Sequence, residues 1–155
     1  MEKPMPSPKS SVLFVCVRNA ARSQMAEAFL KSICPGEFDV ESAGLEPGEL
    51  DPLAVAAMDE VGIDISHNRT KSAFDFITAG RVFGYVVTVC DETSAERCPI
   101  FPGKAQRLHW SFADPASFQG SWEQRLALTR IVRDQIRDRV RAWCDEVCAT
   151  IGASA

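Results

Sequence analysis

A buried strand that runs into a cysteine-containing loop and then into a helix constrains the fold more than any other feature. Val12-Leu-Phe-Val-Cys16 is a continuous apolar run, typical of a central strand covered on both faces. Residues 23–31 are good helix formers, and Cys34-Pro-Gly36 ends this pattern. The sequence therefore predicts a strand, a loop and a helix in direct succession.

Further strands and helices alternate along the chain. We expect strands at residues 38–42, 85–89 and 106–110, and helices at residues 51–61, at 70–77 and from 121 onward. The last helix is the most clearly marked, because apolar residues between Leu128 and Ile151 recur at spacings of three and four. This alternation predicts an α/β fold with a mostly parallel sheet and helices on both faces.

Composition indicates one globular domain without a nucleic-acid partner. The 155 residues are 46% hydrophobic and 25% charged, and the net charge of -4 lacks the basic excess of a nucleic-acid binder. Residues 1–11 are rich in proline, serine and lysine, so we expect a mobile N-terminal tail before a single domain at 12–155.

The apolar stretch at residues 12–17 is too short for a signal peptide core or a membrane span. We therefore expect a cytoplasmic protein with no membrane partner. Six cysteines in such a chain are expected to be free thiols, some of them reactive, and not a structural disulfide framework. Three of these thiols, Cys34, Cys144 and Cys148, are interpreted as structural.

The loop after the first strand has the composition of an oxyanion site. Cys16 and Arg22 stand six positions apart between a strand and a helix N-terminus, where backbone N–H groups and the helix dipole converge. Arg22 can bind two oxygens of a tetrahedral anion, and the same field favours a Cys16 thiolate nucleophile. The alternative is a buried strand-end cysteine beside a solvated arginine.

Two further loop residues are expected to support this site. Asn19 tolerates a left-handed backbone conformation, and the Ser23 hydroxyl can donate a hydrogen bond to the thiolate. The expected substrate-binding segment comprises Cys16, Val17, Arg18, Asn19, Ala20, Ala21, Arg22 and Ser23.

This loop resembles the signature loop of the low-molecular-weight protein tyrosine phosphatase family and of the arsenate reductases that share its fold. The likeness extends through residues 24–28, 42–44, 62–66, 86–90 and 109–115. It implies a four-stranded parallel sheet flanked by helices. Two positions depart from many relatives: Arg18 stands where they have glycine, and Ala21 stands where they have a further cysteine.

Two more cysteines distinguish reduction from phosphate hydrolysis, since arsenate reduction needs two electrons that thiols supply by forming a disulfide. Cys90 ends a strand as Cys16 does, so both sulfurs are expected at one sheet edge. Cys98 follows eight residues later, an arrangement that resembles the thioredoxin-coupled arsenate reductases. The resemblance implies a relay in which Cys98 carries the oxidation to the surface. Packed, inert thiols or a zinc site with a histidine remain alternatives.

Asp114 is implied as the general acid by the same resemblance, while an ordinary Asp-Pro turn is the alternative. Phosphatase relatives that act on phosphotyrosine have aromatic residues after this motif, whereas Ala116-Ser117 follow here. The missing aromatic wall favours a small, bare oxyanion.

The resemblance therefore implies an arsenate reductase with Cys16, Cys90, Cys98, Arg22 and Asp114 as catalytic residues. Its expected partners are arsenate and thioredoxin or a similar dithiol reductant. We expect a monomer that needs no cofactor and no metal. The alternatives are a phosphatase acting on phosphotyrosine or a small phosphoester, and a non-catalytic oxyanion carrier or redox sensor.

Overall fold

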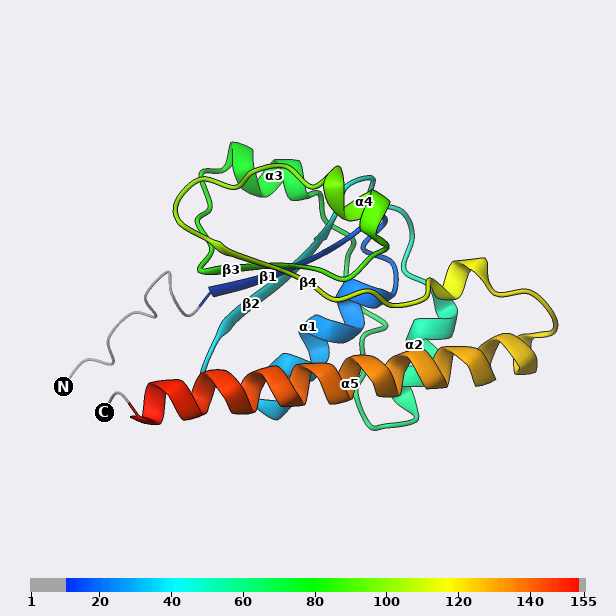
Figure 1. The fold of residues 1–155 in the computed structure, drawn as a ribbon. Coiled ribbons are helices and arrows are strands. Elements are labelled where there is room, and N and C mark those ends of the chain that lie inside the picture. The colour runs from blue at the N-terminus through cyan, green and yellow to red at the C-terminus, as the bar shows by residue number, and fades with distance from the viewer. Residues whose placement is uncertain (1–10, 154–155) are drawn as a thin grey trace.

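The structure, a computed structural model, describes residues 11–153 and is built around one sheet (Figure 1). Its strands are β1 (Ser11–Cys16), β2 (Asp39–Gly44), β3 (Tyr85–Thr88) and β4 (Gln106–His109), in the spatial order β2-β1-β3-β4. Every neighbouring pair is parallel, so the carboxyl ends of the strands share one edge. The predicted four-stranded parallel sheet is confirmed. Of the expected N-terminal tail, only Ser11 lies within the described residues, and it begins β1.

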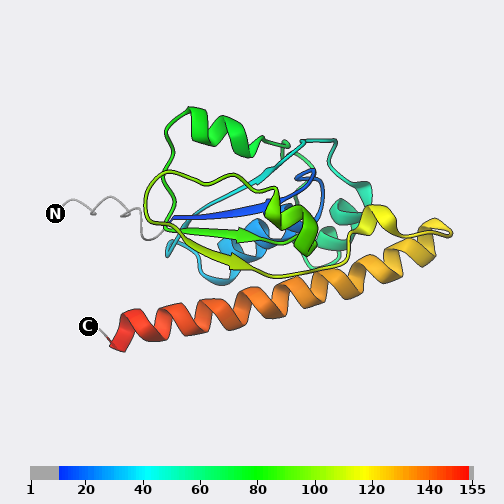
Figure 2. The same cartoon turned by 45° about the horizontal axis from the view of Figure 1, so that its top comes forward.

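Helices cover both faces of the sheet, as the sequence predicts. They are α1 (Arg22–Ile33), α2 (Pro52–Asp59), α3 (Ala73–Thr78), α4 (Glu92–Glu96) and α5 (Trp122–Ala153), with a short 3-10 helix η2 (Pro115–Ser117). In both ribbon views α1, α2 and α5 lie on one side of the sheet and α3 lies on the other (Figures 1 and 2). The expected helix at 70–77 begins only at Ala73, because the Ser72 side chain caps it by accepting the Phe74 N–H.

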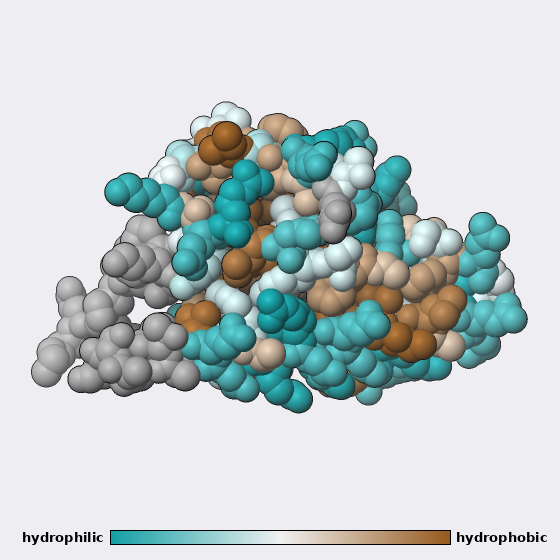
Figure 3. All heavy atoms as spheres, in the orientation of Figure 1, coloured by the Kyte–Doolittle hydropathy of each residue, from teal (hydrophilic) through white to brown (hydrophobic). Residues whose placement is uncertain are grey.

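Alternate residues of the central strands contribute their side chains to two separate apolar layers, one on each face of the sheet. On β1, Val12, Phe14 and Cys16 face α1 and α5, whereas Leu13 and Val15 face α3. The first layer is the larger and contains the buried face of α5. The space-filling view shows a mostly hydrophilic surface with an apolar area where α2 lies against the start of α5 (Figure 3).

Helix α5 is about 48 Å long and runs beneath both α1 and α2. Glu60, which follows α2, accepts hydrogen bonds from Arg130 and Arg133 of α5. The Arg130 guanidinium lowers the pKa of Glu60 to about 2, so this carboxylate is charged at neutral pH. These contacts join the end of α2 to α5. No helix within the described residues is long and apolar enough to cross a membrane.

Candidate active site

The loop that joins β1 to α1 lies at the carboxyl edge of the sheet. Cys16 ends β1 with its side chain buried, and α1 begins at Arg22. The helix has no side-chain cap at Ala21 and no acidic residue in its first turn. Its free N–H groups therefore face the loop, which is the arrangement that binds anions at helix N-termini.

Residues 45–51 hold the loop by its carbonyl oxygens. The N–H groups of Leu45, Glu46, Gly48 and Asp51 donate to the carbonyls of Cys16 (3.1 Å), Val17 (2.8 Å), Arg18 (3.0 Å) and Ala20 (3.0 Å). Because these carbonyls point outward, the loop N–H groups are turned toward the centre of the loop. The loop is thereby preorganised as a ring of donors for an oxyanion.

The Cys16 sulfur receives hydrogen bonds from two neighbours. The Asn19 N–H lies 3.2 Å from Cys16 Sγ, and Ser23 Oγ lies 2.9 Å from it. Asn19 Nδ2 donates to Ser23 Oγ at 2.7 Å, which leaves the serine proton free to point at the sulfur. Both groups therefore stabilise a thiolate.

Asn19 has a φ of 56°, so its predicted left-handed conformation is confirmed. Its buried side-chain oxygen accepts from the Lys71 N–H (2.9 Å) and from Gln24 Nε2 (3.1 Å). Asn19 thus links the loop to α1 and to the segment beside β2.

Arg22 and Asp114 meet at the mouth of the loop. Arg22 Nη2 lies 3.4 Å from Asp114 Oδ2, and Arg22 Nη1 donates to the Phe112 carbonyl at 3.2 Å. Asp114 is 42% exposed and accepts the Ala116 N–H, which orients its carboxyl group. A cavity of about 20 Å³ is lined by Cys16, Arg18, Ala20, Ala21, Arg22, Asp114 and Ala116. Three of the expected substrate-binding residues, Val17, Asn19 and Ser23, are not among the residues that line this cavity.

Cys90 lies just beyond β3 at the same sheet edge as Cys16 and in the same apolar layer. Burial raises its pKa to about 11, although the nearby Arg22 charge lowers it and the Cys16 charge raises it. These electrostatic influences place the two thiols in one site. Cys90 is therefore a protonated thiol in this conformation and must lose its proton before it can attack a sulfur.

Cys98 lies in the opposite layer. It is buried beside Phe83 and Phe101 on the α3 side of the sheet, and burial raises its pKa. The resemblance implies that Cys98 carries the oxidation to the surface, but in this conformation its side chain is buried. Between Cys90 and Cys98 the chain passes from one apolar layer to the other, and the short helix α4 and Arg97 lie on this stretch.

The family model for low molecular weight phosphotyrosine protein phosphatase matches residues 11–152. The chain belongs to this family. An arsenate reductase from Shouchella clausii is 40% identical over 137 residues, which are 88% of this chain and 96% of that protein. A solved arsenate reductase in the phosphate-binding state has a TM-score of 0.70 and 32% identity, covering 88% of this chain and 98% of that one. A thioredoxin-dependent arsenate reductase from Corynebacterium glutamicum has a TM-score of 0.67 and 29% identity, covering 90% of this chain and 62% of that one.

Asp51 brings a further carboxyl group close to this phosphatase-family site, where the sequence assigned it no role. It caps α2 by accepting the Leu53 N–H at 2.9 Å, and its own N–H donates to the Ala20 carbonyl of the loop. Burial raises the pKa of Asp51, and the charge of Asp114 raises it further. A proton is therefore held more readily on Asp51 than on an ordinary aspartate. No local pattern in the sequence signals this proximity.

The expectation that all six cysteines are free thiols is wrong for one pair. Cys34 and Cys144 form a disulfide, whereas Cys16, Cys90, Cys98 and Cys148 are free. The disulfide joins the end of α1 to α5 across 110 residues of sequence. It lies in the same apolar layer as the family's loop but at the other end of α1.

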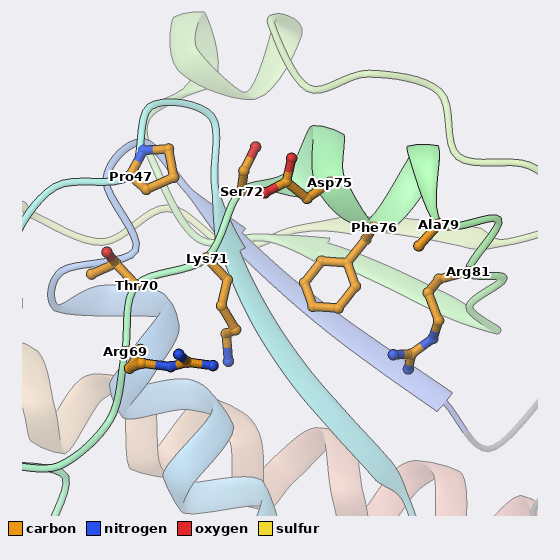
Figure 4. A pocket seen from close by; sticks show the side chains of 9 residues that line it. All are labelled: Pro47, Arg69, Thr70, Lys71, Ser72, Asp75, Phe76, Ala79 and Arg81. Carbon is orange, nitrogen blue, oxygen red and sulfur yellow. The ribbon is translucent and has the colours of Figure 1, made fainter.

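A larger hollow of about 620 Å³ lies away from the loop, between α3 and the segment at residues 69–72 (Figure 4). Two of the cations at its wall are paired: Lys71 Nζ lies 3.5 Å from Glu27 Oε1 and 3.6 Å from Glu41 Oε2, and Arg81 pairs with Asp39. These pairs place carboxylates beside two of the three basic side chains that line the hollow.

Proposed function

We propose that the protein reduces arsenate to arsenite through Cys16, Cys90 and Cys98. The observation that carries the proposal is the shared position of Cys16 and Cys90 at one sheet edge and in one layer, with Arg22 lining the cavity at Cys16 and its charge acting on Cys90. A phosphatase needs a single thiolate, whereas a reductase needs a second thiol within reach. The names of the relatives support the same reaction.

In the first step the Cys16 thiolate attacks arsenic and forms a sulfur–arsenic bond. The loop N–H groups and Arg22 hold the oxygens, and Asp114 gives a proton to the hydroxide that leaves as water. The cavity of about 20 Å³ suits a small oxyanion, because Ala116 supplies no aromatic wall for a phosphotyrosine ring.

In the second step Cys90 loses its proton and attacks the Cys16 sulfur. A sulfur–sulfur bond forms while the sulfur–arsenic bond breaks, and its electron pair stays on arsenic, which leaves as arsenite. Cys98 then attacks Cys90, so that a Cys90–Cys98 disulfide forms and Cys16 is released as a thiolate. A dithiol protein such as thioredoxin returns two electrons and two protons to this disulfide.

The last exchange requires the segment between Cys90 and Cys98 to refold. Eight residues in helical conformation span about 12 Å, whereas a disulfide needs Cα atoms about 5.5–6 Å apart. Helix α4 has only five residues, and its exposed ion pair from Arg97 to Glu46 adds little stability. Unwinding α4 itself therefore costs little, and the main cost of the exchange is moving Cys98 out of the buried layer that it shares with Phe83 and Phe101.

We assign residues 12–155 to one catalytic unit that works as a monomer in the cytoplasm. This is the compartment in which dithiol proteins keep thiols reduced. The reaction steps use one chain and one reductant, so they do not depend on the oligomeric state or on the compartment.

The test is arsenate-dependent oxidation of NADPH in the presence of thioredoxin and thioredoxin reductase, with arsenite measured directly. Cys16→Ser should abolish turnover and Arg22→Ala should nearly do so. Arg81→Ala, which removes a cation beside the distant hollow, is the matched control and should retain turnover. Hydrolysis of p-nitrophenyl phosphate without arsenate turnover would instead assign a phosphatase. Turnover of neither substrate would leave a carrier or sensor.

A further inference from the structure

A second group of thiols lies at the far end of α1 from Cys16. Cys34 directly follows α1, and Cys144 and Cys148 stand one turn apart on α5. Cys34 and Cys144 are joined as a disulfide, and the sulfurs of Cys144 and Cys148 are 3.9 Å apart. All three sulfurs lie within 4.8 Å of one another, and we call them the Cys34 cluster.

The Cys34 cluster is separate from the proposed relay. Helix α1 has twelve residues and is therefore about 18 Å long, and the cluster and Cys16 lie at its opposite ends. Cys34 and Cys144 are buried in the apolar layer, while Cys148 is only partly buried and gives access from solvent. These thiols cannot reach Cys16 or Cys90, so the relay leaves them without a role.

The chemistry of three clustered thiols selects the kind of ligand. Soft thiolates bind soft ions, and structural zinc sites almost always complete four protein ligands. Among the described residues, no further histidine, cysteine, aspartate or glutamate joins the group. Trivalent arsenic forms bonds to three sulfurs and carries a lone pair where zinc would take its fourth ligand. A cluster of three sulfurs therefore suits trivalent arsenic better than zinc.

We propose that the Cys34 cluster, once reduced, binds one trivalent arsenic from arsenite. A dithiol reductant first converts the Cys34–Cys144 disulfide to two thiols, transferring two electrons and two protons. Arsenous acid then exchanges its three hydroxyl groups for three sulfurs. Three arsenic–oxygen bonds break, three arsenic–sulfur bonds form, and each thiol proton leaves with a hydroxyl group as water. No electrons move in this exchange.

The disulfide makes this site conditional on the redox state. With Cys34 and Cys144 joined, only the Cys148 thiol is available, and one thiol cannot hold arsenic at three positions. The reductant that serves the proposed relay would also open the cluster. The proposal rests on the proposed function only for the supply of arsenite, since binding itself needs no turnover.

The test uses full-length protein with Cys16, Cys90 and Cys98 replaced by serine, which leaves the cluster as its only thiols. The protein is reduced with dithiothreitol, freed of it under argon, and mixed with sodium arsenite. Intact mass spectrometry should show one arsenic gained and three hydrogens lost, and all three thiols should become resistant to alkylation. The same protein oxidised beforehand should bind none.

Adding Cys148→Ser to this background should weaken arsenite binding by roughly tenfold or more, because two thiols remain. Cys34→Ser is a second variant with the same expectation, and circular dichroism with a thermal melt checks that each variant folds. Fully reduced protein that binds no arsenite overturns the proposal. Zinc sulfate that displaces arsenite at equal concentration also overturns it and assigns a metal site. The background lacks the whole relay, so failure of arsenate turnover in the wild type has no bearing on this result.

Discussion

Replacing Gly44 by alanine tests whether the backbone behind the loop sets the position of Cys16. Gly44 ends β2, and a Cβ atom at this residue would lie 2.7 Å from Arg18 C, 2.7 Å from Asn19 N and 2.8 Å from Val17 O. Its φ lies outside the left-handed region, so alanine is allowed by the local conformation. The cost of the substitution is therefore the contact with the loop.

The size of the effect follows from these distances. Ordinary contact begins at 3.4 Å, so the loop backbone has to withdraw by about 0.7 Å from the 2.7 Å positions. Backbone atoms cannot rotate away as a side chain can, so the whole loop shifts. A misplacement of about 1 Å can cost about 10²-fold in rate, and overpacking costs about 1–3 kcal/mol of stability. We expect kcat/KM for arsenate to fall by about 10- to 100-fold.

The assay is thioredoxin-coupled arsenate reduction, run well below the melting temperature of each variant. Gly48→Ala is the matched control, because its Cβ would meet only side-chain atoms of Arg18, Cδ and Nη1 at 3.3 Å and Cβ at the ordinary contact distance of 3.6 Å. This control should stay close to the wild-type rate. The reasoning fails if Gly44→Ala turns over like the wild type, or if Gly48→Ala loses as much activity.

Four further outcomes follow from the site. Asp114→Asn should slow the first step by roughly 10²–10⁴-fold in a single-turnover experiment; an unchanged rate would move the acid role to another group, with Asp51 first to test. Cys98→Ser should release one equivalent of arsenite and then stop as a Cys16–Cys90 disulfide, which mass spectrometry of alkylated peptides detects; continued turnover with thioredoxin would contradict the relay. Because the pKa of Cys90 is raised from 9.0 to about 11, its thiolate fraction and the rate of arsenite release should rise about tenfold per pH unit below pH 9; a flat profile would refute the assignment. The buried thiol also contributes stability below its unfolded pKa that is lost between pH 9 and 11, so Cys90→Ser should reduce the fall in melting temperature across that interval.

Local sequence patterns predicted the parts of the site that local conformation determines. The order of strand, loop and helix, and the left-handed Asn19, follow from residue types within about ten positions of Cys16. The outward-facing loop carbonyls could not be predicted, since they depend on backbone N–H groups of residues 45–51 that carry no side-chain signal. The position of Asp51 beside the site could not be predicted either, because it depends on how the segment at residues 45–51 packs against the loop at Cys16.

Long-range packing explains the burial of Cys98 and the pairing of Cys34 with Cys144, neither of which the sequence predicted. The residues after Cys98 indicated a loop, and nothing local predicted its burial, which comes from Phe83, distant in the sequence, and from Phe101. Cys34 and Cys144 each lie in segments with an apolar face, so their burial was predictable but their pairing was not. A contact across 110 residues depends on how α1 crosses α5.

Under the proposed relay, the separation of Cys98 from Cys90 by the sheet also limits oxidation of the resting protein. If the two thiols lay side by side, dissolved oxygen or peroxide could oxidise them to a disulfide before any arsenate arrived. The reductant would then be consumed without reducing arsenate. With Cys98 in the other layer, that idle oxidation requires α4 to unwind first. In this conformation the fold therefore keeps Cys90 and Cys98 apart as thiols, and under the proposed relay Cys98 must leave its buried layer before it can accept the oxidation from Cys90.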